Sequence, residues 1–353
     1  MEEDKSRPKP PNFATAPARE VDFGTMQTGV TLSDVARAAG VGVSTASRVL
    51  RSQGSFSDKK RERVLLEAAR LGYVPNRIAG TLASTRSKLV GIIVPSLTNV
   101  VFPDLLRGAS TILSDAGFQS VLGVTNYSLE CEADIIEAFL SWRPAGLMIA
   151  GLEHTPRART MLAGAGLPVV EMLDTDGEGI DIVVGYSNRR AGQLSAQHLL
   201  ERSYRRIGYV GHNLQRDLRA AKRLEGFEEV LHEAGLTLAA KILGPDSSSV
   251  RAGREGLMQL LDNGPPVDAV YFSNDDMAIG GYFLCMSRLL SVPHDLALFG
   301  YNGLDVGQCI PQPLSTIRTP RIEVGQASAR LLCRGSRSSV VKLEVELIAG
   351  ATT

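Results

Sequence analysis

The stretch that most constrains the fold is residues 31–51, TLSDVARAAGVGVSTASRVLR, which reads as two short helices joined by a tight turn. Thr31 followed by Asp34 forms a Thr-x-x-Asp capping box, so a helix is expected to begin near Leu32. Gly40 accepts a left-handed backbone, which is a common helix stop. After the turn, a second helix is predicted with one apolar face. That face consists of Val43, Ala46, Val49 and Leu50.

Two short helices joined by a glycine-containing turn are the arrangement of a DNA-binding helix-turn-helix. The polar side of the second helix shows Ser44, Thr45, Ser47 and Arg48. A helix of this size fits the major groove, where an arginine such as Arg48 can donate two hydrogen bonds to a guanine edge. Periodicity alone also allows an ordinary helix pair of an enzyme, so further signals are needed.

A third helix is expected in residues 57–72, with Ser57 as its N-cap and Gly72 after its end. Its apolar positions should pack on the first two helices; they are Val64, Leu65, Ala68 and Leu71. Residues 31–88 hold about 11 lysines and arginines against about 4 acidic residues, although the whole chain has 38 of each kind. A basic domain on a mildly acidic body favours DNA binding, and a solvated cationic face is the alternative.

The sequence resembles the lactose-repressor (LacI/GalR) family of bacterial transcription regulators, in order and with the family's spacing, to about residue 335. Within the family it is most similar to the gluconate-utilisation repressors. The family likeness is carried by Thr31-Leu32-x-Asp34-Val35-Ala36, Gly40-Val41, Ser47-Arg48-Val49-Leu50 and 71–77 (LGYVPNR). The closer likeness is carried by 95–102 (PSLTNVVF), 154–157 (HTPR), 168–171 (PVVE) and 303–308 (GLDVGQ).

The resemblance implies a DNA interface made by the helix pair and by a hinge. Val43 and Ser44 occupy base-reading positions, which implies one apolar contact and one short hydrogen bond. In the family, the stretch matching 75–88 folds into a hinge helix on the operator, and a leucine from each subunit wedges into the minor groove. Leu82 holds that position here, with a plain linker as the alternative. The candidate DNA contacts are Thr31, Val43, Ser44, Thr45, Ser47, Arg48, Asn76, Arg77 and Leu82.

From Leu89 onward, apolar runs alternate with amphipathic segments, which is typical of parallel α/β sheets with helices on both faces. Strands are expected at 89–94, 120–124, 146–150, 168–172, 206–210, 268–272 and 295–299. The predicted fold class is an all-α helix-turn-helix head on an α/β body. The resemblance implies two lobes, like those of periplasmic sugar-binding proteins, with a ligand between them. The predicted domains are a disordered extension (1–29), the DNA-binding domain (30–74), the hinge (75–88) and the effector-binding and dimerisation domain (89–353).

Candidate effector contacts follow from the fold and from family positions. Ligands of such sheets bind beyond the carboxyl ends of strands, so Ser96 and Asn99, after the first body strand, are expected to face the cleft. The resemblance adds Arg223 and Asn188, which match family effector positions. It also adds Asn274, which follows a predicted strand where the family places ligand groups.

Departures from the family pattern indicate an anionic, open-chain effector. Ser248 lies in a serine cluster where several relatives place an aromatic ring, and this favours a polyol without a flat face. Asn302 and Gly303 stand where two aspartates are common, and losing these carboxylates removes like-charge repulsion against an anion. Arg223 and Arg321 are expected to clamp its carboxylate. The candidate effector contacts are Ser96, Asn99, Asn188, Arg223, Ser248, Asn274, Asn302 and Arg321.

Enzymatic and metal sites are not indicated. The sequence holds no GxxxxGK[ST] or GxSxG motif, and its five histidines lie apart. The four cysteines show no CxxC pair, which favours reduced thiols over a zinc site or a disulfide framework. The acidic, proline-rich start is unlike a signal peptide, and the apolar runs are too short to span a bilayer. We therefore expect a cytoplasmic protein without catalytic residues, cofactors or metals.

These signals predict a homodimeric repressor of genes for sugar-acid use, of the gluconate type. It would bind a near-palindromic operator and leave it when a small-molecule effector enters the cleft. Two alternatives stay open. One is a family member that answers to another sugar or to a purine, with the ligand as inducer or corepressor. The other is a sugar-binding protein without a DNA function, which would need a signal peptide and would lack residues 31–77.

Overall fold

The computed structural model describes residues 29–50, 54–74, 87–245 and 247–353. The chain divides into two compact units, residues 1–80 and 81–353, which we call the head and the body. The predicted contacts Asn76, Arg77 and Leu82 lie outside the described residues, as does nearly all of the predicted N-terminal extension. No helix in the described ranges is long and apolar enough to cross a membrane.

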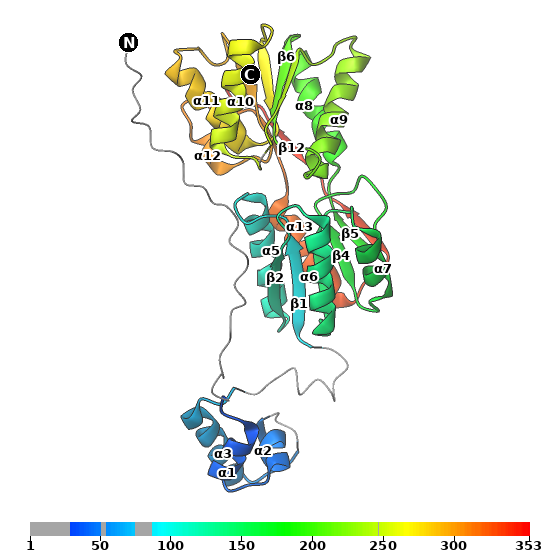
Figure 1. Cartoon of the computed structure of the whole chain (residues 1–353), viewed down its shortest axis with the longest axis vertical. Helices are drawn as coiled ribbons and strands as arrows, with labels where there is room; N and C mark the ends of the chain where they lie inside the picture. Colours follow the sequence, from blue (N-terminus) through cyan, green and yellow to red (C-terminus); the bar gives the residue numbers. More distant parts are fainter. Residues whose placement is uncertain (1–28, 51–53, 75–86, 246) are drawn as a thin grey trace, which may run out of the picture. The chain divides into compact units, whose positions relative to one another are not determined.

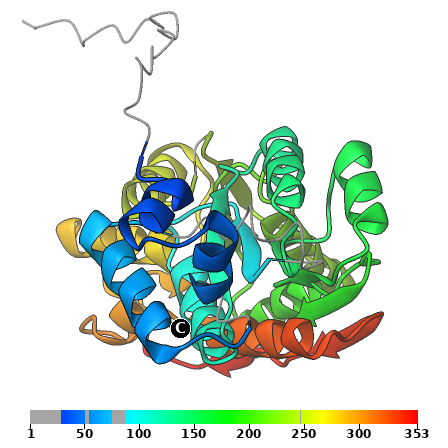
Figure 2. The same cartoon turned by 90° about the horizontal axis from the view of Figure 1, so that it is seen from below.

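In the described part of the head, three helices pack on one another: α1 (Leu32–Ala38), α2 (Val43–Leu50) and α3 (Asp58–Leu71) (Figures 1 and 2). The predicted capping box is confirmed: Asp34 N donates to Thr31 Oγ1 at 3.3 Å, and Thr31 N donates to Asp34 Oδ2 at 3.0 Å. Gly40 ends the first helix with a φ of 62°. The shared core is Val35, Ala36, Ala39, Ala46, Val49, Val64 and Ala68.

Three details of the head differ from the prediction. Val43 is 46% exposed and Leu65 is 45% exposed, so neither belongs to the core. A helical side chain leans toward the N-terminus of its helix, and Val43, at the first position of α2, has no preceding turn to cover. Leu65 lies beside the buried stripe that begins at Val64. Ser57 does precede α3, but its side chain forms no capping hydrogen bond.

The first lobe of the body is a six-stranded sheet in the order β11-β5-β4-β3-β1-β2, with every neighbouring pair parallel. Ile92 and Met148 pack on one face, under α5 (Val101–Asp115) and α13 (Arg321–Arg334). Ile93 packs on the other face, under α6 (Leu129–Ser141) and α7 (Pro156–Gly164) (Figure 1). The strands are β1 (Leu89–Val94), β2 (Gln119–Val124), β3 (Gly146–Ala150), β4 (Val169–Met172), β5 (Ile182–Gly185) and β11 (Ser339–Lys342).

The second lobe is a four-stranded parallel sheet in the order β7-β6-β8-β9. Tyr271 and Phe299 pack under α8 (Asn188–Glu201) and α9 (Leu218–Glu233). Phe272 packs on the opposite face, under α10 (Val250–Asn263) and α11 (Asp275–Ser287). The strands are β6 (Ile207–Gly211), β7 (Ala240–Leu243), β8 (Ala269–Phe272) and β9 (Ala297–Phe299).

The chain passes between the lobes after β5, after β10 (Thr316–Arg318) and after β11. A short helix, α12 (Asp305–Gln308), precedes β10, which pairs antiparallel with β12 (Glu346–Ile348). The α/β body with helices on both sheet faces is confirmed, and each strand predicted from an apolar run is present. The run at 89–94 matches β1 at both ends, whereas β5, β7 and β10 were not predicted.

Candidate functional site

The exposed side of α2 carries residues predicted to read DNA. Ser44 and Arg48 are exposed like Val43, and Thr45 and Ser47 are half-buried. The Arg48 guanidinium lies 5.4 Å from the centroid of the Phe56 ring, a cation–π contact that restricts the side chain. Contact of these residues with DNA stays a prediction, as it does for Thr31, whose hydroxyl and amide are engaged with Asp34.

Two adjoining cavities lie between the lobes of the body, beyond the carboxyl ends of β1, β2, β6 and β8. The larger, of about 610 Å³, is lined by Thr98, Asn126 and Tyr127 of the first lobe and by His212, Asn213, Arg216, Asp217, Pro245, Ser247, Ser248, Ser249, Val250 and Asp276 of the second. The smaller, of about 40 Å³, shares Tyr127, Arg216 and Asp217 with it, and adds Glu132, Glu153 and Arg219 among other residues. The body thus contains the interlobe cavity that a two-lobed binding fold requires.

Asn126 and Tyr127, in the loop after β2, form one wall of the larger cavity. Both have left-handed backbones, with φ of 52° and 60°, a region that is unfavourable for residues other than glycine. Strained backbone of this kind gathers at ligand sites, where the surrounding structure holds it in place. Burial, with the nearby charge of Asp217, raises the pKa of the Tyr127 phenol, so it stays a neutral hydrogen-bonding group.

A hydrogen-bond chain links the buried floor of the second lobe to this cavity. Ser273 Oγ lies 2.9 Å from His212 Nδ1, and His212 Nε2 lies 3.2 Å from Asp217 Oδ2. Burial would raise the pKa of Asp217, but the His212 hydrogen bond and the charges of Arg219, His212 and Arg223 hold it well below its ordinary range. A Ser-His-Asp order is shared with hydrolase triads. Here the Ser273 hydroxyl is buried and outside the cavity lining, so these hydrogen bonds orient the His212 ring.

The predicted contacts Arg223 and Asn188 are buried and bonded to each other. Arg223 Nη1 donates to Asn188 Oδ1 at 3.1 Å, and Nη2 donates to Ser273 O at 3.3 Å. The guanidinium lies 3.9 Å from the centroid of the Tyr301 ring, and Asn188 Nδ2 donates to Leu173 O of the first lobe at 3.1 Å. These contacts join the two lobes, and neither residue lines a cavity. Their role as effector contacts stays a prediction.

Arg321, Asn302 and Asn274 form a second buried group. The Arg321 guanidinium pairs with Asp104 at 3.0 Å and donates to the Asn302 carbonyl. Asn302 Nδ2 donates to Asn274 Oδ1 at 3.3 Å. None of the three lines the cavities, and a carboxylate clamp made by Arg321 and Arg223 stays a prediction.

The remaining predicted effector contacts divide between local bonds and the cavity. Ser96 Oγ lies 2.9 Å from Thr98 Oγ1, and Asn99 Oδ1 accepts from Val101 N at 3.1 Å. Their oxygens therefore support the turn into α5, and of this turn only Thr98 lines the larger cavity. Ser248 does line it, together with Asp276.

Two groups of ion pairs flank the smaller cavity, one at Lys222 and one at His154. Lys222 Nζ of the second lobe lies 2.6 Å from Glu153 Oε1 and 2.5 Å from Asp174 Oδ2, both of the first lobe. His154 lies between two carboxylates, with Nδ1 2.6 Å from Glu132 and Nε2 3.2 Å from Glu171. Burial would lower the pKa of His154, but the hydrogen bonds and charges of these carboxylates raise it to about 9.

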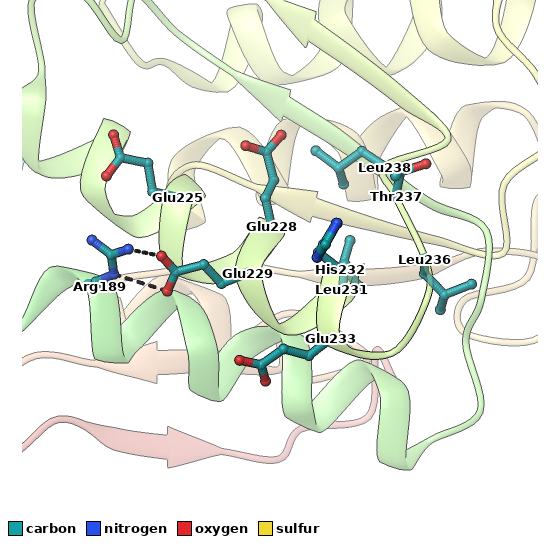
Figure 3. A pocket seen from close by; sticks show the side chains of 10 residues that line it. All are labelled: Arg189, Glu225, Glu228, Glu229, Leu231, His232, Glu233, Leu236, Thr237 and Leu238. Carbon is teal, nitrogen blue, oxygen red and sulfur yellow. Dashed lines mark hydrogen bonds and ion pairs between the residues drawn. The ribbon is translucent and has the colours of Figure 1, made fainter.

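A further hollow, of about 570 Å³, lies on the outer side of α9 (Figure 3). It is lined by residues of the second lobe alone, and its arginine, Arg189, is paired with Glu229. Glu225, Glu228 and Glu233 add negative charge, which disfavours an anionic ligand. Within the described ranges, no group of three or more His, Cys, Asp or Glu side chains is arranged to hold a metal ion.

The sequence prediction missed most of the cavity lining. Tyr127, His212, Arg216 and Arg219 follow or begin predicted elements, but no local pattern marks them as ligand contacts. Only their position after strand ends could have indicated them, because ligands of parallel sheets bind there.

Both units match known families. Residues 31–76 match the bacterial regulatory proteins of the lacI family, and residues 87–349 match the periplasmic binding proteins and sugar binding domain of the LacI family. The chain is 40% identical to the HTH-type transcriptional regulator GntR of Pseudomonas aeruginosa, over 94% of this chain and 98% of that protein.

Two solved structures are similar along head and body. A LacI family transcriptional regulator from Silicibacter pomeroyi has 42% identity and a TM-score of 0.87, covering 92% of this chain and 99% of that one. The lac repressor dimer bound to operator and an anti-inducer has 26% identity and a TM-score of 0.74, with the same coverage.

Proposed function

The chain belongs to the LacI family of bacterial regulatory proteins, and we propose that it represses genes for the use of a sugar acid of the gluconate type. It is a DNA-binding transcriptional repressor, and the class of effector that it answers to is what we propose here. The close likeness to GntR supports a sugar acid, and the polar interlobe cavity supports a small-molecule effector. A regulator of this kind works where its operator is, in the cytoplasm.

Operator binding is assigned to the head. We propose that α2 enters the major groove, with Arg48 on a guanine edge and Val43 and Ser44 at neighbouring bases. The lac repressor dimer on its operator supports a homodimer that reads the two halves of a near-palindrome. In this account Asn76 and Arg77 contact the backbone or minor groove, and paired Leu82 side chains kink the centre of the site.

The observation that carries the effector proposal is the composition of the larger cavity. Its walls present the amides of Asn126 and Asn213 and the hydroxyls of Thr98 and of Ser247 to Ser249, beside one aromatic residue, Tyr127. Such a lining hydrogen-bonds a chain of hydroxyl groups and gives little flat surface for a purine to stack on. An open-chain sugar acid matches it better than a planar base does.

Release from the operator is proposed to follow from the position of the cavity between the lobes. A ligand that contacts both walls stabilises one relative arrangement of the lobes over another. The Lys222 contacts with Glu153 and Asp174 cross the same boundary, so a change in lobe arrangement has to stretch or re-form them. Ligand binding would thereby change the body's support for the two heads on DNA.

Calorimetric titration of the purified protein tests the ligand class. The ligands are D-gluconate, 2-ketogluconate, D-glucose and a purine. Micromolar binding of an acid, with glucose silent, is the expected result. If neither acid binds and glucose or the purine does, the sugar-acid assignment is overturned, while the assignment as a repressor stands.

A further inference from the structure

Arg219, in the first turn of α9, is a buried arginine whose hydrogen-bonding capacity is unused. Its side chain is only 11% exposed and its guanidinium lies 5.5 Å from the Phe102 ring centroid. It donates no hydrogen bond to any residue in the described ranges. The acid near it, Asp217, is 3.9 Å away and already accepts from Ala220 N and bonds His212.

The other buried arginines of the body are satisfied. Arg223 donates to Asn188 and Ser273, and Arg321 is held by Asp104 and the Asn302 carbonyl. A guanidinium carries five donors and cannot lose its charge, so burying one without acceptors is unfavourable. Arg219 therefore differs from its neighbours in having donors free for a ligand.

The charges around the smaller cavity point to the sign of that ligand. Glu132 is paired with His154, Glu153 with Lys222, and Asp217 with His212. Arg219 and the exposed Arg216 line the same cavity; the Asp217 carboxylate lies 3.9 Å from Arg219 without a hydrogen bond to it, and Arg216 forms no ion pair with a described residue. The unused hydrogen-bond donors at this cavity therefore belong to guanidinium groups, which suit an anionic acceptor.

Arg219 points toward the smaller cavity, beside Gly151 and Glu153. Arg219 Nη1 is beside Gly151, where a β-carbon would lie 3.7 Å from it, and Gly151 lines the smaller cavity. Arg216 lines both cavities, so it stands at their junction. The serine and asparagine side chains lie around the larger cavity.

We infer that Arg219, assisted by Arg216, binds the carboxylate of a polyhydroxylated monocarboxylic acid, while the larger cavity takes its hydroxyl groups. The inference rests on the proposed effector function. It assigns the preference for binding an acid over a neutral polyol to Arg219 and Arg216, in place of Arg223 and Arg321. Guanidinium suits this task because its planar fork matches a carboxylate.

The test is calorimetric titration of the full-length protein with D-gluconate and with D-glucitol, which lacks the carboxylate. Wild type is compared with Arg219→Gln, with Arg219→Lys, and with Arg190→Gln as an exposed control on α8. Arg219→Gln is expected to weaken gluconate binding by about 10- to 100-fold, since hydrogen bonds between charged groups are lost, and to change glucitol binding little. Arg219→Lys should fall between, because it keeps the charge and loses the fork. Operator affinity and the unfolding midpoint of each variant report whether the fold is intact.

Two results would overturn the inference while leaving the sugar-acid function standing. One is an affinity of Arg219→Gln for gluconate within about threefold of that of wild type. The other is an equal loss of affinity for gluconate and for glucitol. A wild type that prefers glucitol, glucose or a purine to gluconate would instead defeat the sugar-acid function and this inference with it.

Discussion

Arg219 and Arg223 stand one helical turn apart on α9, yet their surroundings differ. Asn188, Ser273 and Tyr301 enclose Arg223, whereas Arg219 faces a cavity. The resemblance to the family selects Arg223 as an effector contact, because its position in the chain matches that of a family arginine. Which of the two guanidinium groups has free donors depends on residues from distant elements, so the sequence could not distinguish them.

Arg48 is the residue whose replacement most directly tests DNA reading. Arg48→Ala should weaken specific operator binding by about 1–3 kcal/mol and relax base preference, because a bidentate contact to guanine is lost. Fluorescence anisotropy with operator and scrambled duplexes measures both effects, and Arg70→Ala, at the far end of α3, is the control. An equal loss on both duplexes would make Arg48 a phosphate contact.

His154 predicts how stability depends on pH. Its pKa is about 9 in the folded body against an ordinary 6.5, so its stabilisation is complete below pH 6.5 and is lost as pH rises through 9. Urea denaturation should show the free energy of unfolding falling by up to about 3 kcal/mol over this range. The fall should be smaller in His154→Gln and unchanged in His294→Gln, an exposed control. Parallel curves for wild type and His154→Gln would refute the assignment.

At the scale of elements, the helices of the second lobe are joined by close backbone contacts. A β-carbon on Gly192 of α8 would lie 1.8 Å from the Arg223 carbonyl oxygen of α9, and one on Gly226 of α9 would lie 2.1 Å from the Arg189 carbonyl oxygen of α8. The pair α10 and α11 repeats the arrangement at Gly253 and Gly280. Only glycine allows helices to approach this closely, and the contact between α8 and α9 sets where Arg219 and Arg223 lie.

Gly226→Ala should therefore destabilise the body by about 1–3 kcal/mol or more, since the helices must separate to admit a methyl group. Gly164→Ala, at the end of α7 with no atom within 4 Å of the added carbon, is the control and should be neutral or slightly stabilising. Urea denaturation midpoints measure both. Equal midpoints for Gly226→Ala and wild type would contradict the close packing.

The sequence predicted elements well where a single signal dominated. Continuous apolar runs identified the central strands, and the Thr31–Asp34 capping box located the start of α1. It missed β5 and β7, which have four residues each, and β7 alternates between half-buried and exposed positions. β5 is defined by its pairing with β4, and β7 by its pairing with β6. Local sequence patterns do not encode such pairing.

At the scale of the whole molecule, the two-unit organisation could be predicted because charge and periodicity both change along the chain. The position of a cavity between the lobes also followed from the fold resemblance. Its lining did not: of the predicted effector contacts, Ser248 lines the larger cavity, and the others hold the lobes or local turns. A cavity lined from several strand ends of two sheets is a tertiary property.

We propose that a sugar acid in the cleft of the body weakens DNA binding by the head. The most direct measurement is fluorescence anisotropy of the full-length protein on its operator, first selected from random duplexes, with and without saturating D-gluconate. We expect a loss of operator affinity of roughly 5- to 150-fold with gluconate and no change with D-glucitol. Operator affinity that stays constant or rises when gluconate is bound would contradict it.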